Sequence, residues 1–199
     1  EAPRPLHKRL WQDIVRSKLL AQADILDLHG HVSSRIRRLA KEVRSGDPDN
    51  TEAQGARFYW SRLMGDGFRR DRASGGRNAC LNYGYTILRA GTARAILAAG
   101  LHPSLSVHHE SRGDALRLAD DLMEPFRPYV DHFVVRMEEP GDEGLTPGHK
   151  KQLAGILTLD MEGPRGTRPL QVCLDALAYS LAMTYMGKAD GLDLPAGPT

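Results

Sequence analysis

The chain contains only two cysteines among its 199 residues. Cys80 and Cys173 stand alone, without C-x-x-C spacing, which argues against a disulfide-stapled scaffold and a thiolate zinc site, and is typical of a reducing cytoplasm. No apolar run approaches the length of a membrane span, and the first residues lack the apolar segment of a signal peptide. These absences predict a soluble, cytoplasmic protein that makes no contact with a membrane.

The sequence also carries little net charge. Its 27 Lys and Arg residues nearly balance its 25 Asp and Glu residues, so the overall charge does not indicate a nucleic-acid partner. Between residues 57 and 94, however, there are eight arginines and only two acidic residues. Guanidinium groups suit bidentate contact with phosphates, although a solvated helix face explains the pattern equally well. The candidate DNA-contacting residues are Arg57, Arg69, Arg70, Arg72 and Arg77.

Apolar residues at helical spacing predict a mainly α-helical fold. Residues 10–28, 32–43, 52–64 and 78–100 are expected to form helices, and residues 115–137 one kinked helix or two abutting helices around Pro125 and Pro128. Residues 156–160 and 168–172 flank a Gly-Pro-Arg-Gly turn and predict a small β-hairpin near the C-terminus, before a last helix at 176–186. We expect one domain over residues 1–190 and a loose tail over residues 191–199.

The most informative residues for chemistry lie between positions 108 and 128. His108 and His109 end an apolar loop, and Asp121 and Glu124, three residues apart, share one face of a helix. Carboxylates with a neutral imidazole suit Mg²⁺ or Mn²⁺ better than a structural zinc ion. The simpler interpretation is that the histidines cap a helix and the acids are solvated, because no dense ligand motif such as H-E-x-x-H is present.

Several segments resemble a known family. Residues 78–85 read N-A-C-L-N-Y-G-Y, residues 99–103 read A-G-L-H-P, and the histidine-and-acid block continues to Asp131. With residues 10–18 and 52–60, they resemble the CRISPR-associated integrase Cas1, nearest its type II branch. The resemblance implies a metal-dependent DNA endonuclease and integrase of CRISPR adaptation. Such an enzyme joins the 3′-hydroxyl of captured spacer DNA to the CRISPR repeat by transesterification.

The resemblance also implies a site. The family's ligands for Mg²⁺ or Mn²⁺ fall on Glu52, His109 and Glu124, with Asp121 as a neighbouring acid and His108 as the fallback for His109. Because an imidazole must be neutral to bind a metal, activity is expected to fall at acidic pH. Pro125 departs from the family, which often has an acid there, and is expected to kink the chain beside Glu124. The polar residues expected near the site are Asn82, Tyr83 and His108.

The partners implied by the resemblance are double-stranded DNA, the small ferredoxin-like protein Cas2 and, in a type II system, the effector nuclease Cas9. The full-length protein is expected to be a homodimer. Family members normally begin with a β-rich domain, and nothing in this chain reads as that domain. We therefore expect the helical catalytic domain alone, weakly active or inactive by itself. Two alternatives remain: a non-catalytic helical module that binds DNA or a partner, and a general nuclease for branched DNA.

Overall fold

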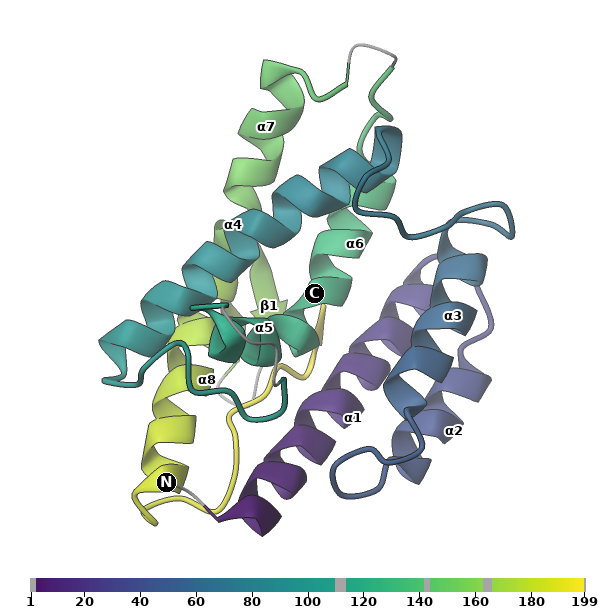
Figure 1. The fold of residues 1–199 in the computed structure, drawn as a ribbon. Helices are drawn as coiled ribbons and strands as arrows, with labels where there is room; N and C mark the ends of the chain where they lie inside the picture. The colour runs from purple at the N-terminus through teal and green to yellow at the C-terminus, as the bar shows by residue number, and fades with distance from the viewer. Residues whose placement is uncertain (1–2, 110–113, 142–143, 163–165, 199) are drawn as a thin grey trace.

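The computed structural model describes residues 3–109, 114–141, 144–162 and 166–198, and its fold is mainly α-helical, as predicted (Figure 1). The elements in chain order are α1 (Arg4–Leu28), α2 (Ser34–Glu42), α3 (Thr51–Leu63), α4 (Gly76–Ala98), α5 (Arg117–Met123), the 3₁₀ turn η1 (Glu124–Phe126), α6 (Arg127–Arg136), α7 (Pro147–Ala154), the 3₁₀ turn η2 (Gly155–Thr158), β1 (Asp160–Glu162), β2 (Arg168–Pro169), α8 (Leu170–Tyr185) and β3 (Gly197–Pro198).

Helix α1 is the central element. It packs against α2 and α3 and also against η1 and α6, so it crosses the molecule between the α2–α3 pair and the second half of the chain (Figure 1). The helix begins before the predicted residue 10, because Pro5 lies in its first turn, where a backbone N–H is not needed. Its buried residues form a nearly continuous surface that includes Ile14, Leu19 and Leu26.

Helix α3 lies close to α1 because one of its residues has no side chain. A Cβ atom at Gly55 would overlap the side chain of Leu19 on α1. The helix is capped by Asn50, whose backbone adopts the left-handed conformation (φ 52°, ψ 46°) and whose side chain accepts a hydrogen bond from the backbone N–H of Ala53. Together these features hold Glu52, in the first turn of α3, beside α1.

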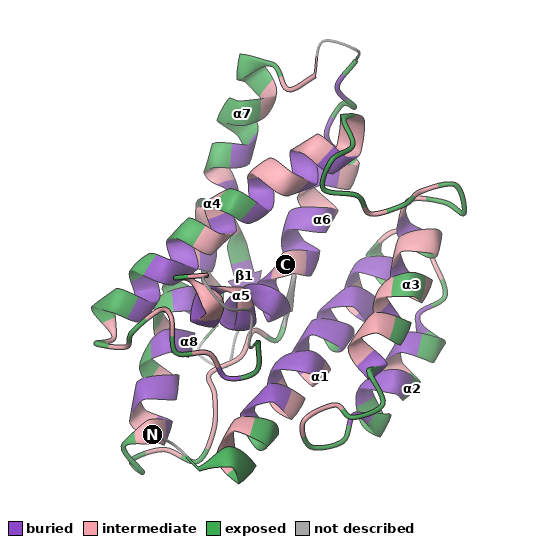
Figure 2. Ribbon diagram, in the orientation of Figure 1, coloured by how far each residue is buried: buried purple, intermediate pink, exposed green. Residues whose placement is uncertain are grey.

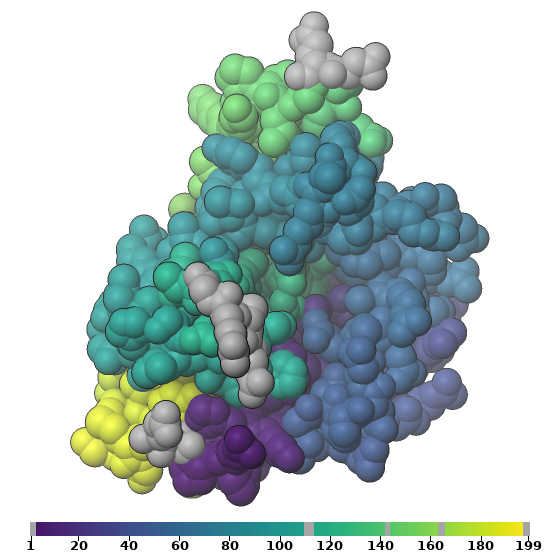
Figure 3. Space-filling view, viewed as in Figure 1, coloured from purple at the N-terminus to yellow at the C-terminus, as the bar shows by residue number. Residues whose placement is uncertain are grey.

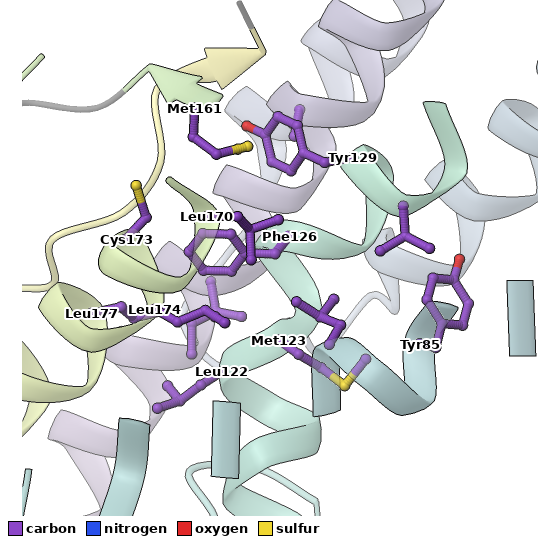
Figure 4. Packing of buried hydrophobic residues seen from close by; sticks show 14 of the residues in the cluster. Tyr85, Leu122, Met123, Phe126, Tyr129, Met161, Leu170, Cys173, Leu174 and Leu177 are labelled. Carbon is purple, nitrogen blue, oxygen red and sulfur yellow. The ribbon is translucent and has the colours of Figure 1, made fainter. Parts of the chain in front are cut away.

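The predicted break near Pro125 is confirmed. Helix α5 ends at Met123, the chain passes through the 3₁₀ turn η1, and α6 then begins with Pro128 in its first turn. Phe126 is fully buried in the hydrophobic core, which Figure 4 shows around it with side chains of η1, α6 and α8. Glu124 opens η1 and is only 4% exposed, so the break places a carboxylate inside the protein.

The C-terminal third contains the predicted hairpin, but with shorter strands. Strand β1 pairs antiparallel with β2, Asp160 opposite Pro169. Residues 156–158 lie in η2, and α8 begins at Leu170 instead of residue 176, since apolar residues at helical spacing from that point face the core. Helix α7 was not expected from the sequence. It buries only Leu153 and is otherwise largely exposed (Figure 2).

The last residues differ from the loose tail predicted after residue 190. Strand β3 pairs antiparallel with β1, which makes a three-stranded sheet in the order β2-β1-β3. The Thr184 hydroxyl donates to the carbonyl of Gly191, and the backbone N–H of Asp193 donates to the Ser180 hydroxyl. The segment therefore packs against α8 and the sheet. No helix among the described residues is long and apolar enough to cross a membrane.

Candidate metal centre

Two of the predicted site residues meet at a buried lysine. Lys18, near the middle of α1, is 7% exposed, and its Nζ lies 2.5 Å from Glu52 Oε1 and 2.5 Å from Glu124 Oε2. The two carboxylates come from α3 and η1, which are far apart in the sequence. The structure thus brings Glu52 and Glu124 to the two sides of one positive charge.

A second cation holds the other oxygen of Glu124. Arg127 Nη1 lies 2.5 Å from Glu124 Oε1, and the guanidinium lies over the ring of Tyr85, 4.4 Å from its centroid. Burial by itself would raise the pKa of Glu124, but Arg127 and Lys18 outweigh burial and lower this pKa well below its ordinary value. Glu124 is therefore an anion at neutral pH.

His109 is oriented by a buried carboxylate. Its Nδ1 lies 2.5 Å from Oδ1 of Asp121, whose side chain is fully buried. The other oxygen of Asp121 accepts hydrogen bonds from the backbone N–H groups of Val107 and His108, at 2.7 and 2.9 Å. The hydrogen bond to Asp121 raises the pKa of His109. A carboxylate on one ring nitrogen is the usual arrangement behind a metal-binding histidine, because it directs the other nitrogen, here Nε2, toward the ion.

His108 has a different environment. Its ring stacks on Trp11 of α1, with centroids 4.2 Å apart and planes 2° from parallel. Burial lowers the pKa of His108, whereas Glu124 and Glu52 both contribute to raising the pKa of His109. Of the two histidines, His109 is the one that is paired with Asp121 and that lines a cavity together with Glu124.

His109 and Glu124 line one cavity of about 710 Å³. Asn82, predicted to lie near the site, also lines it and accepts a hydrogen bond of 2.6 Å from Arg70. Tyr83 packs against the hydrophobic core instead, and Tyr85 lines the cavity. The helical period explains the difference, since residues 82, 85, 86 and 89 share one face of α4 and residue 83 does not.

The arginines predicted to contact DNA lie in different parts of the structure. Arg70 and Arg72 line the cavity, and the exposed Arg69 donates to the carbonyls of Asp66 and Phe68. Arg77 points inward, donating to the carbonyl of Val134 and lying 3.3 Å from a carboxylate oxygen of Glu139.

Arg57 lies elsewhere on α3. With Arg35 and Arg62 it lines a smaller hollow of about 420 Å³ that also includes Phe58. Sequence reasoning missed Lys18 and Arg127, and it placed Arg89 only within the group of arginines between residues 57 and 94. The spacing of three residues between Glu124 and Arg127 was a usable signal for one of them, because residues so spaced are neighbours on a helix.

The chemical types of the predicted ligand side chains suit a hard divalent cation. Glu52 and Glu124 supply carboxylate oxygens and His109 an oriented imidazole, a set suited to Mg²⁺ or Mn²⁺. Within the described part of the chain, no three His, Cys, Asp or Glu side chains already converge as a metal cage, and Lys18 occupies the space between the two glutamates. The elements that carry these residues meet on the face shown in Figure 3, where α1, the α2–α3 pair and the segment after α4 come together.

A family model and a protein of similar sequence both match this chain and carry the same family description. The family model described as CRISPR associated protein Cas1 matches residues 9–142. The CRISPR-associated endonuclease Cas1 of Neisseria meningitidis is 45% identical over 196 residues, which cover 96% of this chain and 64% of that protein. The chain thus spans slightly less than two thirds of that relative.

Two solved structures share the fold. A casposase bound to integration product has a TM-score of 0.78 at 22% identity, covering 96% of this chain and 64% of the casposase. A chain of a Cas6-RT-Cas1–Cas2 complex has a TM-score of 0.72 at 18% identity, covering 93% of this chain and 24% of the other. With the family model matching well over half of its residues, the protein belongs to the Cas1 family of CRISPR-associated proteins.

Proposed function

We propose that this chain is the helical catalytic part of a divalent-metal-dependent DNA integrase of CRISPR adaptation. One observation carries the proposal: carboxylates from α3 and η1 flank the ammonium of Lys18, and Glu124 lines one cavity together with His109, whose ring is held by Asp121. The arginines of that cavity suit a phosphate backbone. A carboxylate–imidazole set beside such a surface is suited to phosphoryl transfer.

In this proposal Glu52, His109 and Glu124 hold Mg²⁺ or Mn²⁺. When bound, the cation polarises the phosphate under attack and offsets the charge that develops on it. Asp121 fixes the ring of His109, and Arg127 keeps Glu124 ionised. No side chain serves as nucleophile. The 3′-oxygen of the captured DNA forms a bond to a phosphorus of the repeat backbone. The bond between that phosphorus and the 3′-oxygen of the preceding repeat nucleotide breaks. The proton of the attacking hydroxyl is passed on to this leaving oxygen.

Double-stranded DNA and Cas2 are the proposed partners. Similarity to a casposase bound to integration product and to a chain of a Cas6-RT-Cas1–Cas2 complex supports them. The homodimer and the contribution of Cas9 are proposals that follow from family resemblance. Because the chain spans 64% of its Neisseria relative, efficient integration is expected of the full-length protein with Cas2 and not of this chain alone.

The test is strand transfer by the full-length protein with Cas2, using Mn²⁺ or Mg²⁺. His109→Ala is expected to abolish the joining of a labelled spacer to repeat DNA. The matched control His31→Ala, just after the C-terminal end of α1, is expected to leave joining unchanged. Normal strand transfer by His109→Ala would refute the site. Cleavage of branched DNA without any joining would favour the general nuclease for branched DNA instead.

A further inference from the structure

We propose that Lys18 is a built-in counter-cation of the metal centre. Its ammonium holds Glu52 and Glu124 together in the metal-free protein and has to leave before a divalent cation can bind both carboxylates. This inference rests on the proposed metal site and adds to it a way in which metal binding is made dependent on DNA.

The position of Lys18 is unusual for a lysine. It lies in α1 between Ser17 and Leu19, which are both buried, one turn after the fully buried Ile14. A buried ammonium is costly unless it is paired, and here it lies 2.5 Å from an oxygen of each of the two glutamates. Lys18 therefore fills the space in which a cation shared by the two carboxylates would lie.

The local charges balance without a metal. Lys18 and Arg127 carry two positive charges, and Glu52 and Glu124 carry two negative charges. A divalent cation added to this set leaves an excess of two positive charges in a largely buried place, which is unfavourable. The charges around this set also cancel, since Arg70, Arg72 and Arg89 are matched by Asp114, Asp120 and Asp121, so they do not offset that excess.

A DNA phosphate in the cavity supplies the missing negative charge. Metal and DNA then favour each other's binding, since coupling between two ligands is reciprocal. The ammonium can leave its position without any movement of α1, because it lies at the end of a flexible four-carbon stem. Lys18 thus keeps metal occupancy low until DNA arrives.

An ordinary structural salt bridge makes a different prediction from a counter-cation. Removing a purely structural lysine destabilises the protein whether or not metal is present. Removing a counter-cation takes the ammonium away from Glu52 and leaves Glu124 with Arg127 alone, at the place where a metal can take over. The loss of stability is then restored by the metal, and the metal binds more tightly than in the wild type.

The experiment uses Lys18→Met in the full-length protein, because methionine keeps much of the side-chain volume without the charge. Thermal unfolding is measured in EDTA and in Mn²⁺, and Mn²⁺ affinity by titration calorimetry. We expect a lower midpoint in EDTA, recovery to near the wild-type midpoint in Mn²⁺, and binding of Mn²⁺ tighter by about tenfold. The exposed Lys41→Met on α2 is the matched control and is expected to change neither quantity.

Coupling to DNA is measured with a duplex whose 3′-deoxy ends cannot react. Adding this duplex is expected to tighten Mn²⁺ binding to the wild type more than to Lys18→Met. If Lys18→Met does not fold in EDTA, Lys18→Met/Glu124→Gln removes one charge of each sign. That double variant is expected to fold in EDTA and to lose the Mn²⁺ effect.

Several results would overturn the inference: full stability of Lys18→Met in EDTA, a loss of stability that Mn²⁺ does not restore, or weaker Mn²⁺ binding. If His109→Ala weakens Mn²⁺ binding while Lys18→Met leaves it unchanged, the counter-cation role fails and the metal site stands. If neither the wild type nor Lys18→Met binds Mn²⁺, with or without the duplex, the metal site itself fails.

Discussion

At the scale of single residues, the position of His109 depends on Asp121. The carboxylate of Asp121 contacts the ring of His109 through Oδ1. Its Oδ2 accepts hydrogen bonds from the backbone N–H groups of Val107 and His108. Asp121→Asn replaces one of these accepting oxygens with an amide NH₂ group. The substitution therefore removes the hydrogen bond to the ring of His109 or those to the backbone N–H groups of Val107 and His108. We expect Mn²⁺ affinity to fall by roughly tenfold or more, as for other partners of metal-binding histidines, with the helical circular dichroism retained.

The neighbouring Asp120→Asn is the control for this substitution. Asp120 pairs with Arg89 on the wall of the cavity and does not contact His109 in the described structure. Its Mn²⁺ affinity is expected to match the wild type. Unchanged affinity in Asp121→Asn would show that the carboxylate does not position His109.

A second residue-scale prediction concerns pH. Asp131 is buried beneath Tyr85, whose hydroxyl donates to it, and burial raises its pKa from 3.8 to about 7 despite the nearby Arg127 and Lys18. The folded protein therefore keeps a proton on Asp131 between about pH 4 and 7 that the unfolded chain releases. The contribution to stability is present below pH 4 and is lost as the pH rises to 7.

The magnitude of this loss is on the order of 4 kcal/mol. Denaturant unfolding of the metal-free protein at several pH values should show the decline in the wild type. The curve for Asp131→Asn should be flatter, since asparagine keeps an acceptor for Tyr85 and does not titrate. Parallel curves for the two proteins would contradict the raised pKa.

Single residues also show where sequence reasoning reached its limit. Glu52, His109 and Glu124 could be named because each lies in a segment that resembles the family, and the structure brings the two glutamates together. Lys18 could not be named in the same way. Lysines are almost always exposed, and only the packing of α3 and η1 on α1 makes this one buried.

At the scale of elements, the approach of α3 to α1 sets the position of Glu52. Gly55→Ala forces a Cβ into the buried side chain of Leu19, so either that side chain or α3 has to shift. We expect a loss of about 1–3 kcal/mol in the free energy of unfolding, measured with denaturant. Mn²⁺ binding should weaken as well, because Glu52 lies one turn from Gly55.

Gly67→Ala is the matched control, since a Cβ at that position meets open space and its φ is not positive. Its stability is expected to stay within about 0.5 kcal/mol of the wild type. Equal stability of the two alanine variants would mean that the α1–α3 contact is soft and does not fix Glu52.

An element could be predicted from the sequence when its buried residues recur at regular spacing. The long amphipathic helices were recognised because one side of each faces the core, and the break at Pro125 because proline lacks the backbone N–H that a helix needs. Helix α7 was missed because it buries only Leu153 and so lacks a periodic pattern. Its start is fixed instead by Thr146 and His149, which cap each other's backbone N–H groups, and a histidine is not the usual partner in such a cap.

At the scale of the whole molecule, the arginines expected to contact DNA have separate roles. Arg72 lines the cavity, whereas Arg77 is held by the carbonyl of Val134 and by Glu139. Arg72→Ala in the full-length protein should weaken duplex binding and lower the slope of log affinity against log salt by about 1. Arg77→Ala should leave that slope unchanged and lower the melting temperature. Fluorescence anisotropy across a salt series checks both, and identical slopes in the two variants would contradict the assignment.

The central position of α1 has a consequence for the folding of the protein during its synthesis on the ribosome. The hydrogen bond between Lys18 and Glu124 spans 106 positions, and the apolar side of α1 packs on the same distant segment. A ribosome adding roughly 5–20 residues per second needs on the order of ten seconds to produce that segment. During this interval the side of α1 that packs on η1 and α6 is without its partner, whereas α2 and α3 already follow it closely in the chain. We expect this exposed side of α1 to be prone to aggregation until η1 and α6 have been made.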